Sequence, residues 1–177
     1  MRIVMGIDPG LANTGFGVVQ VAGARTSALD GGVIEVPAGD PLERRLEQIH
    51  KSISELLEWH EPEALALEDL YFGKNVRSAM AVGQARGVVM LAAAQRRIPC
   101  FDYTPQAVKM SVCGTGGADK DQVKHMVGAL LGLPTAPPSE HAADALAVAI
   151  CHAAQSPQMI KISRGAGATA GNEAVTR

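Results

Sequence analysis

The stretch RIVMGIDPGLANTGFGVVQVA, residues 2–22, decides the fold, because it predicts two strands joined by a tight connection. Its first part, RIVMGID, is a nearly continuous apolar run, which is typical of a largely buried strand. PGLANTG is rich in turn-forming residues, and FGVVQVA again has the composition of a strand. A third run of this kind, GGVIEV, covers residues 31–36. We therefore predict three consecutive strands in an antiparallel meander.

Beyond the meander, helical and strand patterns alternate. Residues 41–60 place apolar side chains at helical spacing before Pro62, and ALALEDL (64–70) predicts a short buried strand. We further expect helices over residues 75–97, from Pro105, over 119–131 and from Glu140, and a strand over 98–103. This order predicts an α/β fold in which a mixed sheet is flanked by helices.

Composition indicates one globular domain. A chain of 177 residues with 47% hydrophobic residues can bury a sizeable core. We place this domain at residues 1–154 and expect residues 155–177, which lose periodicity and are rich in Gly, Ala, Ser and Thr, to form a flexible C-terminal tail.

The cysteines and the absence of long apolar runs point to the cytoplasm. Cys100, Cys113 and Cys151 are scattered and odd in number, which favours reduced thiols over a disulfide framework or a thiolate zinc site. The N-terminus resembles no signal peptide, and no apolar run has the length of a membrane span.

Charge is unevenly distributed along the chain, although the formal net charge is only −2. Residues 40–69 contain nine acidic residues against three basic ones, whereas residues 70–125 contain eight basic residues against three acidic ones. Such a division could give one face that repels a polyanion and one that attracts it, or it could reflect ordinary solvated surface charge.

Four polar residues are candidates for chemistry. Asp8 and Glu68 end two apolar strands, and His141 and Asp144 lie three apart in the first turn of the predicted last helix, so they share one helical face. Helix capping by Ser139 and the helix dipole would explain acidic residues here without any further function, but they would not explain His141. Oxygen and nitrogen ligands without cysteine suit Mg²⁺ or Mn²⁺.

Several motifs together resemble a known family. GIDPGLANTGFGVV, LALEDLYFGKN, GQARGVV, QAVKMSVCGTGGADKDQV and HAADALAVAI are similar to motifs of the RuvC-type Holliday-junction resolvases, in the same order, over roughly residues 3–152. The resemblance implies an RNase H-like fold with five strands, a homodimer, and metal ligands at Asp8, Glu68, His141 and Asp144. Many members have a third aspartate where this chain has His141.

The resemblance also implies a reaction, which is symmetric cleavage of two strands of a four-way DNA junction to leave 5′-phosphate and 3′-hydroxyl ends. In a two-metal mechanism, cations about 4 Å apart activate a water and stabilise the leaving oxygen. Asp8 would bridge the metals, and Glu68 and Asp144 would bind opposite ones. His141 could be a ligand or the base that accepts the proton of the water, and the sequence does not separate these roles.

Contacts to DNA and to a second subunit are predicted from aromatic, basic and small residues. By position in the family motifs, Tyr71 is the residue we expect to stack on an exposed base. The other expected DNA contacts are Phe72, Lys74, Arg77, Lys109, Lys120, Gln122 and Lys124. Ala79, Gly83 and Gly87 have the four-residue spacing that lets another helix approach closely, and they are expected at the dimer interface, although packing on the chain's own sheet is the alternative.

Two other functions fit part of the sequence. DPGLANTG resembles the phosphate-contacting hairpin of actin-like ATPases, but those proteins have a second, duplicated domain for which this chain is too short. An RNA-processing nuclease of the RNase H-like superfamily would keep the metal site and change the substrate. The sequence does not show whether a branch-migration motor complex delivers a junction to the protein.

Overall fold

The computed structural model describes residues 1–69 and 76–155, and these form one five-stranded sheet in the order β3-β2-β1-β4-β5. β1 (Arg2–Asp8), β2 (Asn13–Ala22) and β3 (Arg25–Glu35) pair antiparallel. β4 (Ala64–Glu68) and β5 (Cys100–Tyr103) continue the sheet from β1 as parallel strands. The mixed RNase H-like sheet that was expected from the sequence is therefore confirmed.

The third strand is longer than predicted, since it begins at Arg25 and not at residue 31. Gly23, with a φ of 63°, lies in the two-residue turn that sets Ala22 opposite Arg25, and glycine adopts this conformation without strain. A bulge opposite Val18 and Val19 then interrupts the pairing. β3 is an edge strand with no fully buried residue, so its first half lacks the apolar pattern by which strands are recognised.

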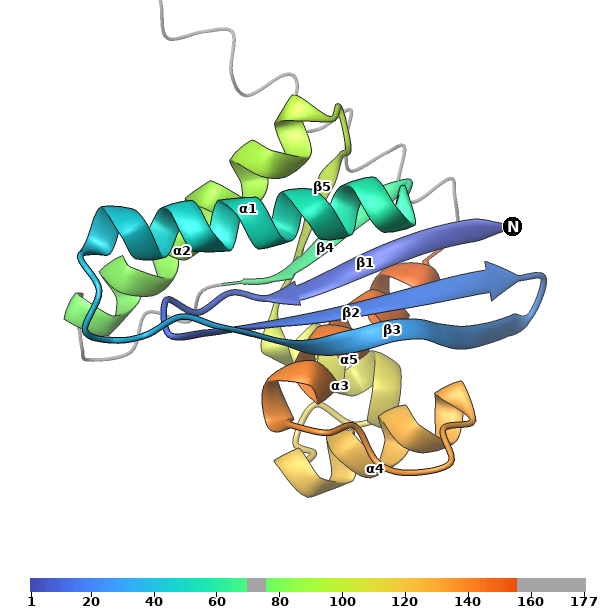
Figure 1. The fold of residues 1–177 in the computed structure, drawn as a ribbon. Coiled ribbons are helices and arrows are strands. Elements are labelled where there is room, and N and C mark those ends of the chain that lie inside the picture. The colour runs from blue at the N-terminus through green and yellow to red at the C-terminus, as the bar shows by residue number, and fades with distance from the viewer. Residues whose placement is uncertain (70–75, 156–177) are drawn as a thin grey trace, which may run out of the picture.

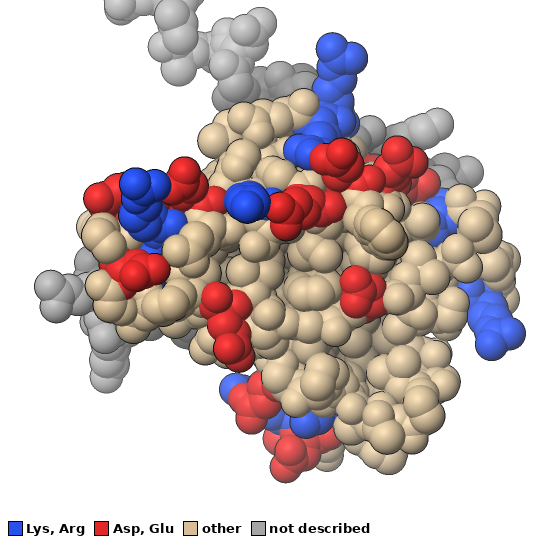
Figure 2. Space-filling view, in the orientation of Figure 1, with Lys and Arg blue, Asp and Glu red and all other residues tan. Residues whose placement is uncertain are grey.

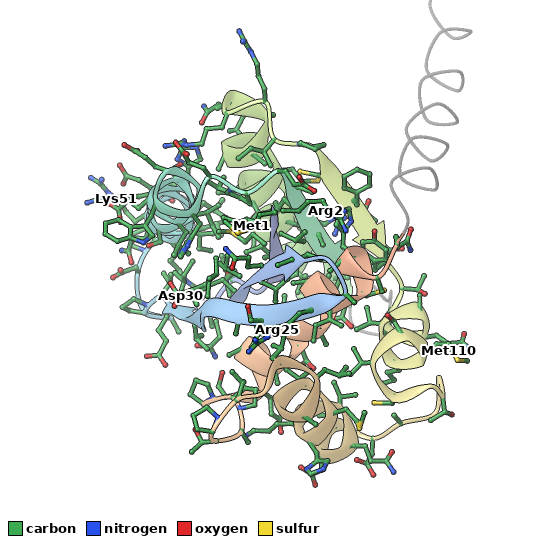
Figure 3. All side chains as sticks on the ribbon, turned by 90° about the vertical axis from the view of Figure 1, so that its right-hand side faces the viewer. Met1, Arg2, Arg25, Asp30, Lys51 and Met110 are labelled. Atoms are coloured by element: carbon green, nitrogen blue, oxygen red, sulfur yellow. The ribbon has the colours of Figure 1, made fainter. Side chains whose placement is uncertain are left out.

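Helices cover both faces of the sheet (Figure 1). α1 (Leu42–His60) and α2 (Val76–Gln95) lie on one face. On the other face, α5 (Glu140–Ala153) packs directly on the sheet, and α3 (Pro105–Cys113) and α4 (Lys120–Leu131) pack against α5. The view from the side shows side chains filling the space on both sides of the sheet, with Met110 pointing outward from α3 (Figure 3).

Alternation along the central strands divides the interior into two cores. Met5 and Ile7 of β1 pack with Leu65 and Leu67 of β4 against α1 and α2. The intervening residues, such as Val4 and Ala66, face α5. Asp8 and Glu68 continue this second set at period two, so both carboxylates belong to the face that α5 covers.

α5 is buried along nearly its whole length, which agrees with its alanine-rich sequence. Three glycines of the sheet let it approach closely. A Cβ at Gly15 would lie 2.1 Å from the carbonyl oxygen of His141, one at Gly6 would lie 2.0 Å from that of Ala145, and one at Gly17 would lie 2.7 Å from Leu146. The helix therefore rests on bare backbone at these points.

No helix in the described part of the chain is both long and apolar enough to cross a membrane. Residues 156–177, which include nearly all of the expected C-terminal tail, lie outside the described residues. On the face seen in Figure 2, acidic and basic side chains both occur along α1, and the surface below that helix is mostly uncharged with separate acidic side chains.

Candidate active site

Asp8 and Glu68 come together because their strands are parallel neighbours. Ile7 is paired with Leu67 in the ladder between β1 and β4, so Asp8 and Glu68 are the next residues of adjacent strands, at the same edge of the sheet. Both side chains are expected on the same face by alternation. The Asp8 side chain is only 19% exposed.

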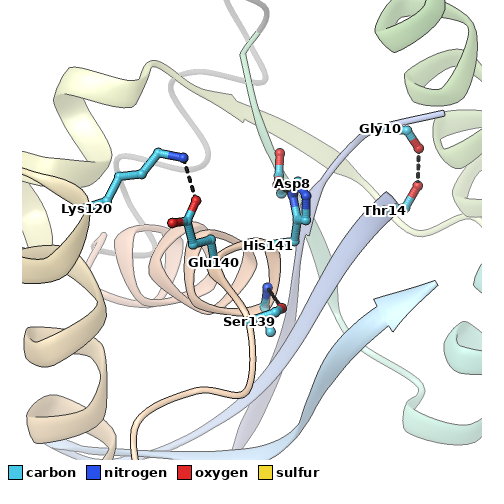
Figure 4. A network of polar contacts seen from close by, with 8 residues as sticks. Asp8, Gly10, Thr14, Lys120, Ser139, Glu140 and His141 are labelled. Carbon is cyan, nitrogen blue, oxygen red and sulfur yellow. Dashed lines mark hydrogen bonds and ion pairs between the residues drawn. The ribbon is translucent and has the colours of Figure 1, made fainter. Parts of the chain in front are cut away.

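The N-terminus of α5 brings His141 and Asp144 to this edge. The Ser139 hydroxyl accepts a hydrogen bond from the Ala142 N–H at 3.0 Å and so caps the helix. His141 Nδ1 lies 2.7 Å from Oδ2 of Asp8 (Figure 4). The capping interpretation is thus correct for Ser139, but it does not account for His141, whose partner lies on a different element.

A tight turn after β1 supports the same edge. The buried Thr14 hydroxyl donates to the carbonyl of Gly10 at 2.6 Å (Figure 4). A Cβ at Gly10 would lie 2.2 Å from the carbonyl oxygen of Asn13, so only glycine fits there without movement. The turn fixes the chain directly after Asp8.

The carboxylates are close enough to shift one another's ionisation. Burial, followed by the negative charges of Asp8 and Asp144, raises the pKa of Glu68 to about 7. Burial and the charge of Asp8 also raise the pKa of Asp144. Ionised acids in this arrangement repel one another, and a bound cation would remove that repulsion.

Two of the predicted DNA-contacting lysines lie within electrostatic range of this cluster. The ammonium groups of Lys109 on α3 and Lys120 on α4 act against the rise in the pKa of Glu68. Lys120 Nζ also contacts Glu140 at 2.7 Å, which joins the first turns of α4 and α5 (Figure 4). Basic groups therefore flank the carboxylates on the side formed by α3 and α4.

The donor set fits a divalent cation. Carboxylate oxygens with one imidazole nitrogen suit Mg²⁺ or Mn²⁺, and the mutual repulsion of the acids favours a positive charge among them. Among residues 1–69 and 76–155, however, no three His, Cys, Asp or Glu side chains are already arranged to hold a metal ion. While His141 Nδ1 contacts Asp8, Nε2 is the ring nitrogen that a metal could bind.

The other predicted DNA contacts have different outcomes. Gln122 forms a capping box with Asp119, since the Gln122 amide oxygen accepts from the Asp119 N–H at 3.0 Å. Lys124 borders a groove of about 420 Å³ between α4 and the following loop, residues 132–136. Tyr71, Phe72 and Lys74 lie outside the described residues, as does the side chain of Arg77.

The small residues of α2 differ in their exposure. Ala79 and Gly83 are half-buried and Gly87 is exposed, and a Cβ at Gly87 would meet no described atom within 4 Å. Met80 and Leu91, which are 63% and 53% exposed, extend this surface. At Gly87, the alternative of close packing on the chain's own sheet is therefore wrong.

Some residues that shape the site were not singled out from the sequence. Arg86 of α2 contacts the end of β4, and Glu140 contacts Lys120. Arg86 is part of the GQARGVV motif, and a single arginine within an otherwise uncharged helix segment was the available signal. Glu140 was interpreted from the sequence only as an acid favoured by the helix dipole, so its contact with Lys120 was not predicted.

Carboxylates at the ends of two adjacent central strands, covered by a helix with a third, define an RNase H-like α/β protein. Residues 4–152 match the family described as crossover junction endodeoxyribonuclease RuvC. The chain belongs to this family, so the resemblance found in the sequence is confirmed.

Individual relatives agree with the family assignment. The chain is 50% identical to crossover junction endodeoxyribonuclease RuvC of Moorella thermoacetica, covering 88% of this chain and 93% of the relative. The corresponding protein of Pelotomaculum thermopropionicum is 48% identical, over 85% and 92%. The structure is similar to that of Thermus thermophilus RuvC in complex with Holliday junction substrate, with a TM-score of 0.83, 40% identity, and coverage of 86% and 93%.

Proposed function

We propose that this protein resolves Holliday junctions by hydrolysing one phosphodiester bond in each of two strands. The observation that supports this most directly is the meeting of Asp8, Glu68, His141 and Asp144 at one edge of the sheet, in a chain that belongs to the RuvC family. The products would be 5′-phosphate and 3′-hydroxyl ends.

These four residues are proposed as the ligands of two divalent cations, Mg²⁺ or Mn²⁺. Bound there, the cations would activate the attacking water and stabilise the leaving 3′ oxygen. Asp8 is next to Glu68 in the β1–β4 register and contacts His141, and both relations support it as the shared ligand. The raised pKa values of Glu68 and Asp144 support a site that is completed by positive charge.

His141 has two possible roles, and its contact with Asp8 bears on both. If Nδ1–H donates to the Asp8 carboxylate, the lone pair is on Nε2, which can bind a metal or accept a proton. In either role, the hydrogen bond from Nδ1 to Asp8 would hold the imidazole ring in place. A neutral ring is required in both.

Junction DNA is proposed to approach across α3 and α4. Lys109 and Lys120 flank the carboxylates, and Lys124 lies one helical turn after Lys120. Such side chains neutralise phosphates without distinguishing bases. Stacking of a base on Tyr71 remains a prediction from the sequence.

Symmetric cleavage requires two active sites, so we propose a homodimer formed through α2. The exposed apolar side chains and the open glycine on the outer face of this helix support that surface as the interface. Delivery of the junction by a branch-migration motor complex and a cytoplasmic location both remain predictions.

The test is cleavage of a synthetic four-way junction, compared with linear duplex of the same sequence and with a structured RNA, in Mg²⁺ and in Mn²⁺. We expect paired, symmetric cuts in the junction alone. Asp8→Asn should abolish cleavage and leave junction binding largely intact, because the basic surface provides the affinity. Preferential cleavage of the RNA, or near wild-type cleavage by Asp8→Asn, would contradict the proposal.

A further inference from the structure

Arg86 makes two contacts that meet at the end of β4. Its side chain extends from α2 and is only 12% exposed. Nη1 donates to the backbone carbonyl of Glu68 at 3.0 Å, and Nη2 forms an ion pair with Oδ1 of Asp102 on β5. One guanidinium therefore joins a helix and the ends of two strands.

The carbonyl that Arg86 binds belongs to the peptide unit between Glu68 and Asp69. The N–H of the same unit, that of Asp69, donates to the carbonyl of Tyr103 at 2.8 Å. Both polar groups of this peptide are thus hydrogen-bonded, and Arg86 supplies one of the two bonds. The peptide lies at the last residue of the strand, where regular pairing with β1 has already ended at Leu67.

This position matters because Glu68 lies in an unfavourable environment. Its carboxylate is partly buried and lies near Asp8 and Asp144, whose negative charges repel it when all three are ionised. A restraint on its own backbone opposes movement away from these acids. The planar guanidinium can bind a carbonyl and a carboxylate at once, whereas an ammonium would hold either partner less rigidly.

We propose that Arg86 is a positioning residue for metal binding: it holds the Glu68 backbone from α2 so that the carboxylate stays within the ligand set. Because α2 also presents the proposed dimer surface on its exposed side, Arg86 connects the interface helix to the active site. This inference rests on the proposed function for its cleavage measurements, but not for its metal-binding measurements.

The experiment compares wild type with Arg86→Met, Arg86→Lys and Asp102→Asn. Arg96→Met is the matched control, because Arg96 also forms an ion pair near the end of α2, with Glu58 of α1 at 3.1 Å, away from the site. For each variant, Mn²⁺ binding is measured by calorimetry in the absence of DNA, and junction binding is measured in the absence of metal. Single-turnover cleavage is measured across an Mg²⁺ titration, and stability is measured by unfolding with denaturant.

We expect Arg86→Met to weaken Mn²⁺ binding at least fivefold, raise the Mg²⁺ midpoint by a similar factor and slow cleavage at least tenfold. Junction binding should stay within twofold. Arg86→Lys should recover part of the loss, Asp102→Asn should have a smaller effect of the same kind, and Arg96→Met should match wild type. Wild-type Mn²⁺ binding by Arg86→Met or Arg86→Lys would overturn the proposal, as would equal losses in Arg96→Met.

The two hypotheses fail in different ways. If wild type bound Mn²⁺ but did not cleave junctions, the proposed function would be wrong, while the calorimetric comparison would still decide the role of Arg86. If Arg86→Met did not fold, the Arg86→Lys and Asp102→Asn proteins would decide it by the same measurements.

Discussion

Burial and neighbouring negative charge act together on the carboxyl group of Glu68. In the folded protein its pKa is about 7, whereas a free glutamate has a pKa near 4.5. Folding therefore favours its protonated form. The stabilising contribution of this group is complete below pH 4.5 and is lost as the pH rises through about 7.

A first prediction follows for the metal-free protein. Glu68→Gln should be more stable than wild type at pH 8, by roughly 2 to 3 kcal/mol, and the difference should shrink toward pH 4.5. Denaturant unfolding in EDTA between pH 4.5 and 8 measures this directly. Parallel pH profiles for the two proteins would show that Glu68 is not the group responsible.

The same carboxyl group should make metal binding depend on pH. A ligand must lose its proton to bind a cation, so Mn²⁺ affinity should fall as the pH is lowered below about 7. Calorimetry in buffers of different ionisation enthalpy should detect proton release at pH 6.5 and less of it at pH 8. Constant affinity across this range would be inconsistent with Glu68 as a ligand.

His141 is tested by two substitutions with opposite expectations. His141→Asp should remain active, because a carboxylate on the same helix face is a good Mg²⁺ ligand, and its relative activity in Mg²⁺ should rise. His141→Ala should lose most cleavage activity in both metals, since it can neither bind metal nor accept a proton. Wild-type rates for His141→Ala in Mg²⁺ and Mn²⁺ titrations would reduce His141 to a helix-start residue.

The sequence predicted the candidate ligands, because acids at the ends of apolar strands and a histidine at a helix start are visible as patterns. It could not predict the contact between His141 and Asp8, which lie 133 positions apart and meet only through packing. The interaction of Arg86 with a backbone carbonyl could not be predicted either. Every residue has such a carbonyl, and the sequence does not show which one a side chain contacts.

At the scale of elements, the placement of α5 depends on glycines of the sheet. Because a Cβ at Gly15 would lie 2.1 Å from the His141 carbonyl, Gly15→Ala must push the start of α5 away from β2. We expect a loss of about 1 to 3 kcal/mol in stability and a larger relative loss of cleavage. Gly39→Ala is the control, because no described atom lies within 4 Å of a Cβ there. Equal activity of the two variants would exclude this packing constraint.

Most elements were predicted from periodicity, and the exceptions have physical causes. The first half of β3 was missed because an edge strand with exposed, polar residues shows no apolar alternation. The close approach of α5 was missed because glycine gives the same signal in a strand, a turn and a contact with another helix. For Gly87, the sequence left open whether it packs on the chain's own sheet or at a dimer interface. The structure excludes packing on the sheet.

For the whole molecule, the exposed face of α2 predicts a dimer that a single charge should disrupt. Leu91→Glu should cost the folded monomer little, since Leu91 is 53% exposed, but it would bury an unpaired charge in the proposed interface. Sedimentation velocity should show a shift toward monomer and a loss of paired junction cuts. Leu42→Glu, at a 40% exposed leucine of α1, should stay dimeric. A dimeric Leu91→Glu protein would place the interface elsewhere.

The late position of α5 in the chain has a consequence for synthesis on the ribosome. Asp8 and Glu68 leave the exit tunnel early, but His141 and Asp144 follow more than seventy residues after Glu68, on the helix that fills the space beneath the sheet. A nascent chain that lacks this helix holds only half of the proposed ligand set and exposes one face of its sheet. The proposed ligand set is therefore complete only when translation of the domain is nearly finished.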